Sequence, residues 1–414
     1  MEKSPNTYVG PVAPPERIQV LDILRGLALF GIIAANMRAF NTPMPAYFDV
    51  SLMWNQGLDR VVQALINTFI SGKFITLFSF LFGIGFAVQV GRAEAKGARP
   101  GSFYPRRLLI LMLLGLAHGF LLWSGDILAP YALYGFLLLL FRKRRQKTVL
   151  IWAAACYVWP LFMSLLLLAA TSAGVRMPMP PPATPADLER TIAAYSTGSY
   201  AQMFSERLKE LAMLWAGVVF YYPRVFGIFL LGLYTWRSGV IQNLSAHVPR
   251  LRAWRLWGLV IGLAGNAVWV TIYQIWHLNP FKPSPLGVIA DLASGAGVPA
   301  LSLCYASTVA LLALRSDWVK RLEPFAAVGR TALSNYLMQT VLCTTLYNNW
   351  GFGLYGAVGP ALGLVPTVLI YGCQVVLSQW WVRRFLFGPM EWFWRTLTYG
   401  RRQPMLVTVE PVSA

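Results

Sequence analysis

Apolar runs of bilayer length recur along the whole chain, with short polar segments between them. A helix needs about 20 apolar residues to cross a bilayer core, and 57% of these residues are hydrophobic while 12% are charged. Because a water-soluble protein carries about a quarter charged residues, most of the chain is expected to face lipid. The predicted membrane-spanning segments are 20–40, 74–91, 106–124, 127–142, 148–171, 212–236, 254–277, 287–314, 327–349 and 361–382.

Lysine and arginine alternate between the two sides of this arrangement. If the N-terminus lies inside, most of the 35 Lys and Arg residues fall in inner segments, for example in 92–107, 142–147 and 250–255. The positive-inside rule then predicts ten spans with both termini cytoplasmic. The net charge of +19 is expected to hold these loops against anionic lipid, and no nucleic-acid partner is expected.

One all-α domain, a polytopic helical membrane bundle, is predicted for residues 1–414. Its parts are a cytoplasmic tail (1–19), a ten-helix bundle (20–382) with an external loop (172–211), and a cytoplasmic interfacial helix and tail (383–414). The first 19 residues have no apolar core followed by a small-residue cleavage site, so no signal peptide is expected. The first apolar run therefore stays as a membrane anchor.

Three stretches are not expected to be simple spans. Residues 58–73 have helical apolar spacing, which predicts a surface or re-entrant helix. A proline-rich run at 178–185 opens the external loop, and 187–207 is predicted to be a helix lying on the membrane surface. Tryptophan and tyrosine prefer the headgroup zone, so 388–402 is expected to lie along the inner interface.

Asp22 and Arg25 are ionisable residues within the first span, where a charge costs about 2.5–3.5 kcal/mol. They are three residues apart on one helix face and are expected to pair. Asn36 lies about 21 Å farther along the helix axis, near the outer leaflet, and Gly26 and Gly31 favour close approach of another helix. A local ion pair with a capping amide is one interpretation. The other is that the spare donors of Arg25 bind a phosphate or a second carboxylate.

His118 lies past the midplane of the third span, and Asp126 follows after a very short external turn. We expect the two side chains to meet near the outer leaflet. A histidine oriented by a carboxylate is a competent general base near neutral pH. The equally weighted alternative is a buried histidine bonded to a carbonyl of a neighbouring helix.

Two further spans carry polar residues. Arg224 follows Pro223, which is predicted to break the sixth span, and a charge there binds an anionic ligand or neutralises an acidic partner. In the ninth span Asn335, Tyr336 and Gln339 lie close together. They are interpreted as interhelical contacts or as the lining of a binding site.

Several motifs of soluble enzymes are missing. The chain has no Walker loop, no dinucleotide fingerprint and no HExxH. The cysteines lie in apolar stretches without metal-ligand spacing, so buried structural thiols and no metal site are expected. These cysteines are Cys156, Cys304, Cys343 and Cys373.

Long ordered blocks of the chain resemble the YeiB-like family of bacterial membrane proteins. They are RIQVLDILRGLALFGIIAANM (17–37), KFITLFSFLFGIGFA (73–87), RRLLILMLLGLAHGFLLWSGDILAPYALYG (106–135), GRTALSNYLMQT (329–340) and FGPMEWFWRTLTYG (387–400). The first span, with Asp22, Arg25, Gly26 and Asn36, is also similar to a wider superfamily of transmembrane acyltransferases. That superfamily includes heparan-α-glucosaminide N-acetyltransferase. The resemblance implies an acyl-CoA tunnel, a catalytic histidine and a bacterial inner-membrane location.

Three functions are therefore expected in order of preference. The first is a membrane acyltransferase with acyl-CoA as donor and a glycan or lipid acceptor at the outer side. In it Arg25, with Asp22 and Arg224, binds the donor, His118 with Asp126 is the base, and Asn36 stabilises the oxyanion. The second is a permease for a small anion or lipid-linked precursor, built on helix breaks at Pro223 and Gly72. The third is a structural or regulatory partner of an envelope enzyme, with the lipid bilayer as its surroundings.

Overall fold

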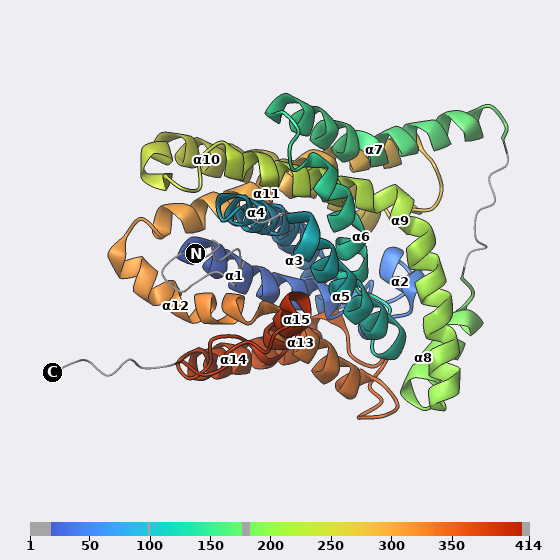
Figure 1. The fold of residues 1–414 in the computed structure, drawn as a ribbon. Coiled ribbons are helices and arrows are strands. Elements are labelled where there is room, and N and C mark those ends of the chain that lie inside the picture. Colours follow the sequence, from blue (N-terminus) through green and yellow to red (C-terminus); the bar gives the residue numbers. More distant parts are fainter. Residues whose placement is uncertain (1–17, 98–99, 176–182, 408–414) are drawn as a thin grey trace, which may run out of the picture.

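The computed structural model describes residues 18–97, 100–175 and 183–407, and within them the chain is helical without a strand. Figure 1 shows the helices packed as one bundle. They are α1 (Gln19–Asn36), α2 (Met44–Phe48), α3 (Gly57–Phe69), α4 (Lys73–Ala95), α5 (Pro100–Leu121), α6 (Leu128–Leu138), η2 (Leu139–Phe141), α7 (Gln146–Ser172), α8 (Pro185–Ser196), α9 (Tyr200–Arg237), η3 (Leu244–His247), α10 (Val248–Val270), η4 (Thr271–Ile275), α11 (Pro285–Leu312), α12 (Ser316–Arg330), α13 (Ala332–Tyr347), α14 (Pro360–Val382) and α15 (Pro389–Tyr399).

Among the described residues, eight helical segments are long and apolar enough to cross a membrane. Each overlaps one of the ten predicted spans. Of the other two predicted spans, 127–142 corresponds to the shorter apolar helix formed by α6 and η2. The span 327–349 is not one helix, because it includes the end of α12, a break at Thr331, and α13. The chain therefore has the architecture of a multi-pass membrane protein, while the number of spans stays a prediction.

Most of the helix α1 is buried in the bundle, and the helix carries glycines where its neighbours cross it. A Cβ built on Gly26 would lie 1.9 Å from the carbonyl oxygen of Phe325 on α12, and one on Gly31 would lie 1.9 Å from the Phe74 ring of α4. The close approach expected at both glycines is confirmed. Small residues of this kind are the usual contacts between membrane helices.

The outer helices present apolar side chains to the surroundings. In Figure 1, α7 and α10 lie along one side of the bundle and α13 and α14 along the opposite side. On α7 only Val149 and Ala153 are buried, while Ile151 and Trp152 are exposed. An exposed apolar surface of this length is expected to face lipid tails.

The predicted surface helix over 187–207 is wrong in its bounds. The chain forms α8, breaks at residues 197–199, and restarts as α9, which continues without interruption into the predicted sixth span. Ser199 causes the restart, because its side chain accepts from the Gln202 amide while the Gln202 side chain accepts from the Ser199 amide. This capping box satisfies backbone donors that have no partner within the helix.

The expected helix break at Pro223 is also wrong, because α9 is one helix of 38 residues. A proline has no N–H to offer the carbonyl four residues earlier, which here belongs to Val219. The indole nitrogen of Trp159 on α7 donates to that carbonyl at 3.0 Å. A neighbouring helix thus replaces the missing hydrogen bond.

The cysteines do not all match the expectation of buried thiols. All four are free; Cys304 and Cys343 are buried, Cys156 is half-buried and Cys373 is exposed. Cys373 lies on the outward face of α14, where an apolar thiol suits lipid as well as a core.

Candidate functional site: a cavity with an arginine-rich end

A cavity of about 290 Å³ lies between α1, α4, α5, α6, α9, α12, α13 and α15. From Asp22 to Ile32, both of which line it, α1 extends about 15 Å at 1.5 Å per residue. The two ends of the cavity differ in chemistry. The end where α1 begins is charged, and the inner walls are apolar, with residues such as Leu29, Phe86 and Leu111.

Four guanidinium groups lie at the charged end: Arg25, Arg107, Arg330 and Arg395. They come from α1, α5, α12 and α15, so helices far apart in the sequence supply one cluster. Among the described residues, Arg25 donates to a single acceptor, Asp22 Oδ1, at 2.7 Å. The Nε of Arg330 is buried and has no hydrogen-bond partner there.

Two carboxylates accompany these arginines, and both are engaged. Asp22 accepts from Arg25, as the sequence predicts. Glu391 of α15 accepts from the backbone amides of Leu333 (2.6 Å) and Ser334 (3.2 Å) at the start of α13. Burial raises the pKa of Glu391, against the lowering effect of its bond to the Ser334 hydroxyl. The excess positive charge of this end is therefore available to an anion.

The aromatic helix α15 closes the charged end on one side. The ring of Trp394 lies 3.5 Å from the Arg107 guanidinium carbon, and its indole nitrogen donates to the Arg107 carbonyl at 2.9 Å. This helix belongs to the segment expected at the inner interface. Its packing against α5 orients Arg107 toward the cavity instead of leaving the side chain free.

At the inner end of the cavity, Tyr336 of α13 separates the apolar walls from the histidine. The Tyr336 and His118 rings have centroids 5.3 Å apart. His118 Nδ1 lies 2.8 Å from Asp126 Oδ1, and His118 Nε2 lies 3.0 Å from the Thr340 hydroxyl. Both side chains of the His118–Asp126 pair are almost fully buried, at 1% and 5% exposure.

The geometry around His118 favours one tautomer of the neutral ring. The Asp126 carboxylate only accepts hydrogen bonds, so a neutral His118 carries its proton on Nδ1 and keeps a basic Nε2. The second Asp126 oxygen accepts from the Ala129 amide at 2.8 Å, which fixes the carboxylate. An imidazole oriented in this way has the arrangement of a general base.

Other predicted site residues lie elsewhere. Asn36 is at the end of α1 and does not line the cavity. Asn335 and Gln339 face α14, where Asn335 donates to Ser378 at 3.0 Å and Gln339 donates to Gln374 at 2.8 Å. These two amides hold α13 and α14 together, and only Tyr336 of that group reaches the cavity.

Arg224 is also away from the cavity. Its guanidinium carbon lies 5.3 Å from the centroid of the Tyr157 ring on α7, and a Cβ on Gly295 of α11 would lie 3.5 Å from its Nη2. Arg224 therefore lies between α7, α9 and α11. Arg107, Arg330 and Arg395 were not predicted as site residues. In the sequence they indicate only which loops lie on the inner side of the membrane.

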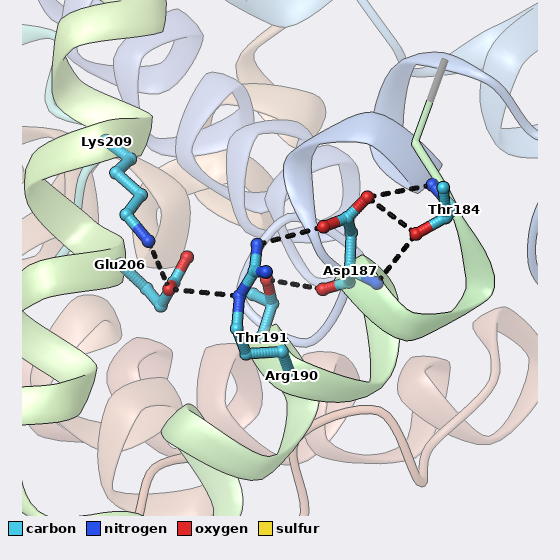
Figure 2. Close-up of polar contacts among 6 residues, drawn as sticks. All are labelled: Thr184, Asp187, Arg190, Thr191, Glu206 and Lys209. Atoms are coloured by element: carbon cyan, nitrogen blue, oxygen red, sulfur yellow. Dashed lines mark hydrogen bonds and ion pairs between the residues drawn. The ribbon is translucent and has the colours of Figure 1, made fainter. Parts of the chain in front are cut away.

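A second cavity of about 230 Å³ lies between α2, α8 and α9. Figure 2 shows the charged side chains on its wall. Arg190 forms ion pairs with Asp187 at 3.1 Å and with Glu206 at 3.6 Å, and Lys209 donates to Glu206 at 2.6 Å. The hydrogen bonds of Thr184 hold the pKa of Asp187 below its usual value.

This second cavity is linked to the histidine pair through its neighbour Glu210. One oxygen of Glu210 accepts from Ser124 at 2.6 Å and from Tyr195 at 2.9 Å. Ser124 lies two residues before Asp126, so Glu210 restrains the short turn that positions the Asp126 carboxylate. Groups that line the second cavity are thus coupled to the geometry of His118.

Comparison with known proteins identifies relatives along nearly the whole chain. The family model described as "Protein of unknown function (DUF418)" matches residues 235–401. The chain is 37% identical to the uncharacterised protein YxaH of Bacillus subtilis, over 95% of this chain and 97% of the relative. It is 31% identical to an uncharacterised Bacillus acidopullulyticus protein over 97% of this chain and 99% of that protein. It is 28% identical to the uncharacterised protein YeiB of Escherichia coli over 94% of this chain and 98% of the relative.

Proposed function

The chain belongs to the YeiB-like family, which includes YxaH and YeiB, and we propose that it acts as a membrane acyltransferase. The acyl group comes from an acyl-CoA at the arginine-rich end, which is the cytoplasmic end by the positive-inside rule. It is transferred to a hydroxyl or amine on the opposite side of a bacterial inner membrane. The observation that supports this proposal is the cavity itself, which extends from the arginines to the ring that touches His118.

The donor is held by its phosphates. Guanidinium groups match phosphate geometry and stay charged in any environment. Arg25 and Arg330 retain donors that the described residues do not use. The thioester-bearing arm then enters between apolar walls, where water is excluded and the thioester carbonyl becomes more sensitive to nearby dipoles.

The histidine activates the acceptor. The acceptor group takes the place of the Thr340 hydroxyl at His118 Nε2, transfers its proton there, and attacks the thioester carbonyl. Asp126 stabilises the imidazolium that forms. The cavity of α8 and α9 provides an approach for a polar acceptor from the side opposite the arginines, because carboxylates and cations on its wall bond sugar or lipid headgroup hydroxyls.

Binding of the donor is tested by thermal unfolding of the detergent-purified protein with coenzyme A, acetyl-CoA and a matched adenine nucleotide. A ligand at 100 times its dissociation constant stabilises the folded state by about 2.7 kcal/mol. We expect the CoA species to raise the unfolding temperature and Arg330→Ala to abolish the shift. The exposed Arg190→Ala is the control and keeps it. A well-folded protein that no CoA species stabilises contradicts the proposal.

The base is tested separately. His118→Ala is expected to lower acyl transfer by about 10²–10⁴-fold and to leave the CoA-dependent stabilisation intact. His247→Ala, in η3 and away from the cavity, is the control and keeps full transfer. Unchanged transfer in His118→Ala excludes the histidine as the base.

The permease alternative retains one of its two expected helix breaks. Gly72 has φ +82° between α3 and α4, and the next residue, Lys73, is only 1% exposed with its amine 2.6 Å from the Asn67 carbonyl. A break with a buried cation is typical of transporter sites. Solute uptake by proteoliposomes that contain only this protein favours the permease, because a transferase alone accumulates nothing.

A further inference from the structure

The Tyr336 side chain has an unusual position for a buried phenol. It is 4% exposed and lines the cavity, yet its hydroxyl has no hydrogen-bond partner among the described residues. The Ile127 backbone N–H is directed at the hydroxyl oxygen, and because it is itself a donor it leaves the hydroxyl proton unused. The proton of this hydroxyl is therefore free to be donated.

A second tyrosine that lines the same cavity differs from Tyr336, because its hydroxyl is paired. The hydroxyl of Tyr131 lies 2.6 Å from the Ser79 hydroxyl and 3.4 Å from the Ile75 carbonyl. Buried polar groups are normally bonded in this way, because an unpaired one loses its hydration without replacement. The Tyr336 hydroxyl is thus an unpaired hydrogen-bond donor in the cavity wall, away from the arginine-rich end.

The position of Tyr336 relative to His118 limits which hydrogen-bond acceptors can reach its hydroxyl. The His118 ring packs against the Tyr336 ring, and His118 is anchored on both nitrogens. An atom attacked by a group activated at His118 lies beside Tyr336, at the inner end of the cavity.

We propose that the Tyr336 hydroxyl donates a hydrogen bond to the thioester carbonyl oxygen of the donor and stabilises the oxyanion during transfer. This inference rests on the proposed acyltransferase function. It replaces the expectation for Asn36, which does not line the cavity. Tyr336 thereby favours a donor that has a carbonyl oxygen at this position.

The chemical step balances with these groups alone. The acceptor O–H or N–H gives its proton to His118 Nε2 while its oxygen or nitrogen bonds the carbonyl carbon, and the carbonyl oxygen becomes an oxyanion bonded to Tyr336. The oxyanion then collapses, the carbon–sulfur bond breaks, and the thiolate leaves with the proton from His118. The products are the acylated acceptor and free coenzyme A.

The test compares two ligands that differ at the carbonyl and needs no acceptor. Binding of acetyl-CoA and of its thioether analogue S-ethyl-CoA is measured by titration for the wild type, Tyr336→Phe and Tyr371→Phe. Tyr371 is the matched control, because it is buried outside the cavity and its hydroxyl donates to the Gly26 carbonyl at 2.7 Å. One hydrogen bond changes affinity by about two- to tenfold.

We expect the wild type and Tyr371→Phe to bind acetyl-CoA about two- to tenfold more tightly than S-ethyl-CoA, and Tyr336→Phe to bind both equally. A preference that survives in Tyr336→Phe, or none in the wild type, overturns the inference while CoA binding still supports the transferase. If the folded wild type binds neither ligand, both the proposed acyltransferase function and this inference are wrong.

Thermal unfolding of the same variants without ligand tests the inference independently. Removal of an unpaired hydroxyl sacrifices no hydrogen bond, so Tyr336→Phe is expected to keep the unfolding temperature of the wild type, whereas Tyr371→Phe lowers it. An equal loss in both variants means that Tyr336 has a protein partner, and this result overturns the inference.

Discussion

Gly26 of α1 and Gly329 of α12 face each other so closely that a Cβ on Gly329 would lie 2.9 Å from the Gly26 backbone nitrogen and 1.9 Å from the Asp22 carbonyl oxygen. This contact brings Arg330, the next residue on α12, to the charged end of the cavity beside Asp22 and Arg25. The arginine cluster therefore depends on a crossing that only glycine permits.

Gly329→Ala is expected to destabilise the protein by about 1–3 kcal/mol, because a methyl group there forces two backbones apart. Thermal unfolding in detergent measures the loss. Gly372→Ala on α14 is the control, since a Cβ there meets nothing within 4 Å. Equal unfolding temperatures for both variants contradict the tight crossing.

The amides of Gln339 and Gln374 are expected to stabilise the protein without binding ligand. A double-mutant cycle that replaces each by leucine is expected to show a coupling of about 0.6–1.7 kcal/mol, the range for hydrogen bonds between membrane helices. The CoA-dependent stabilisation stays unchanged in the Gln339→Leu variant if it is folded. Loss of CoA binding in that variant would instead place Gln339 in the site.

The indole of Trp159 is expected to matter only while residue 223 is proline. Trp159→Phe leaves the Val219 carbonyl without a donor and costs about 0.5–1.5 kcal/mol. In a Pro223→Ala background the restored backbone N–H bonds that carbonyl, so the same substitution costs less. If the effects of the two substitutions on the unfolding free energy simply add, the Trp159 indole does not replace the missing backbone hydrogen bond.

Glu391 is expected to make stability depend on pH. Because burial raises its pKa in the folded protein, the stabilisation that its proton contributes is fully present below the unfolded carboxyl pKa of about 4.3. It is lost as the pH rises through the folded pKa. Glu391→Gln keeps the acceptor for the Leu333 amide and has no such loss.

Unfolding temperatures measured from pH 4 to pH 8 check this prediction. The wild type is expected to fall relative to Glu391→Gln as the pH rises. The exposed Glu323→Gln on α12 is the control and follows the wild type. Parallel curves for the wild type and Glu391→Gln remove Glu391 as the source of the pH dependence.

The sequence alone was sufficient for the fold class and for two local pairs. Apolar length and periodicity predict helices in lipid because hydrogen bonds within a helix satisfy the backbone without water. Asp22 with Arg25 follows from helix spacing, and His118 with Asp126 follows from the very short turn between their helices. Both are contacts between residues fewer than ten positions apart.

Contacts between distant segments were decided only by tertiary structure. The spacing of Asn335, Tyr336 and Gln339 shows that they are close, but the rotation of α13 about its axis sends two of them to α14 and one to the cavity. Arg107, Arg330 and Arg395 look like loop charges in sequence, and helix crossings gather them with Arg25. Local pattern determines helices, whereas the packing of side chains between helices determines which faces enclose a cavity.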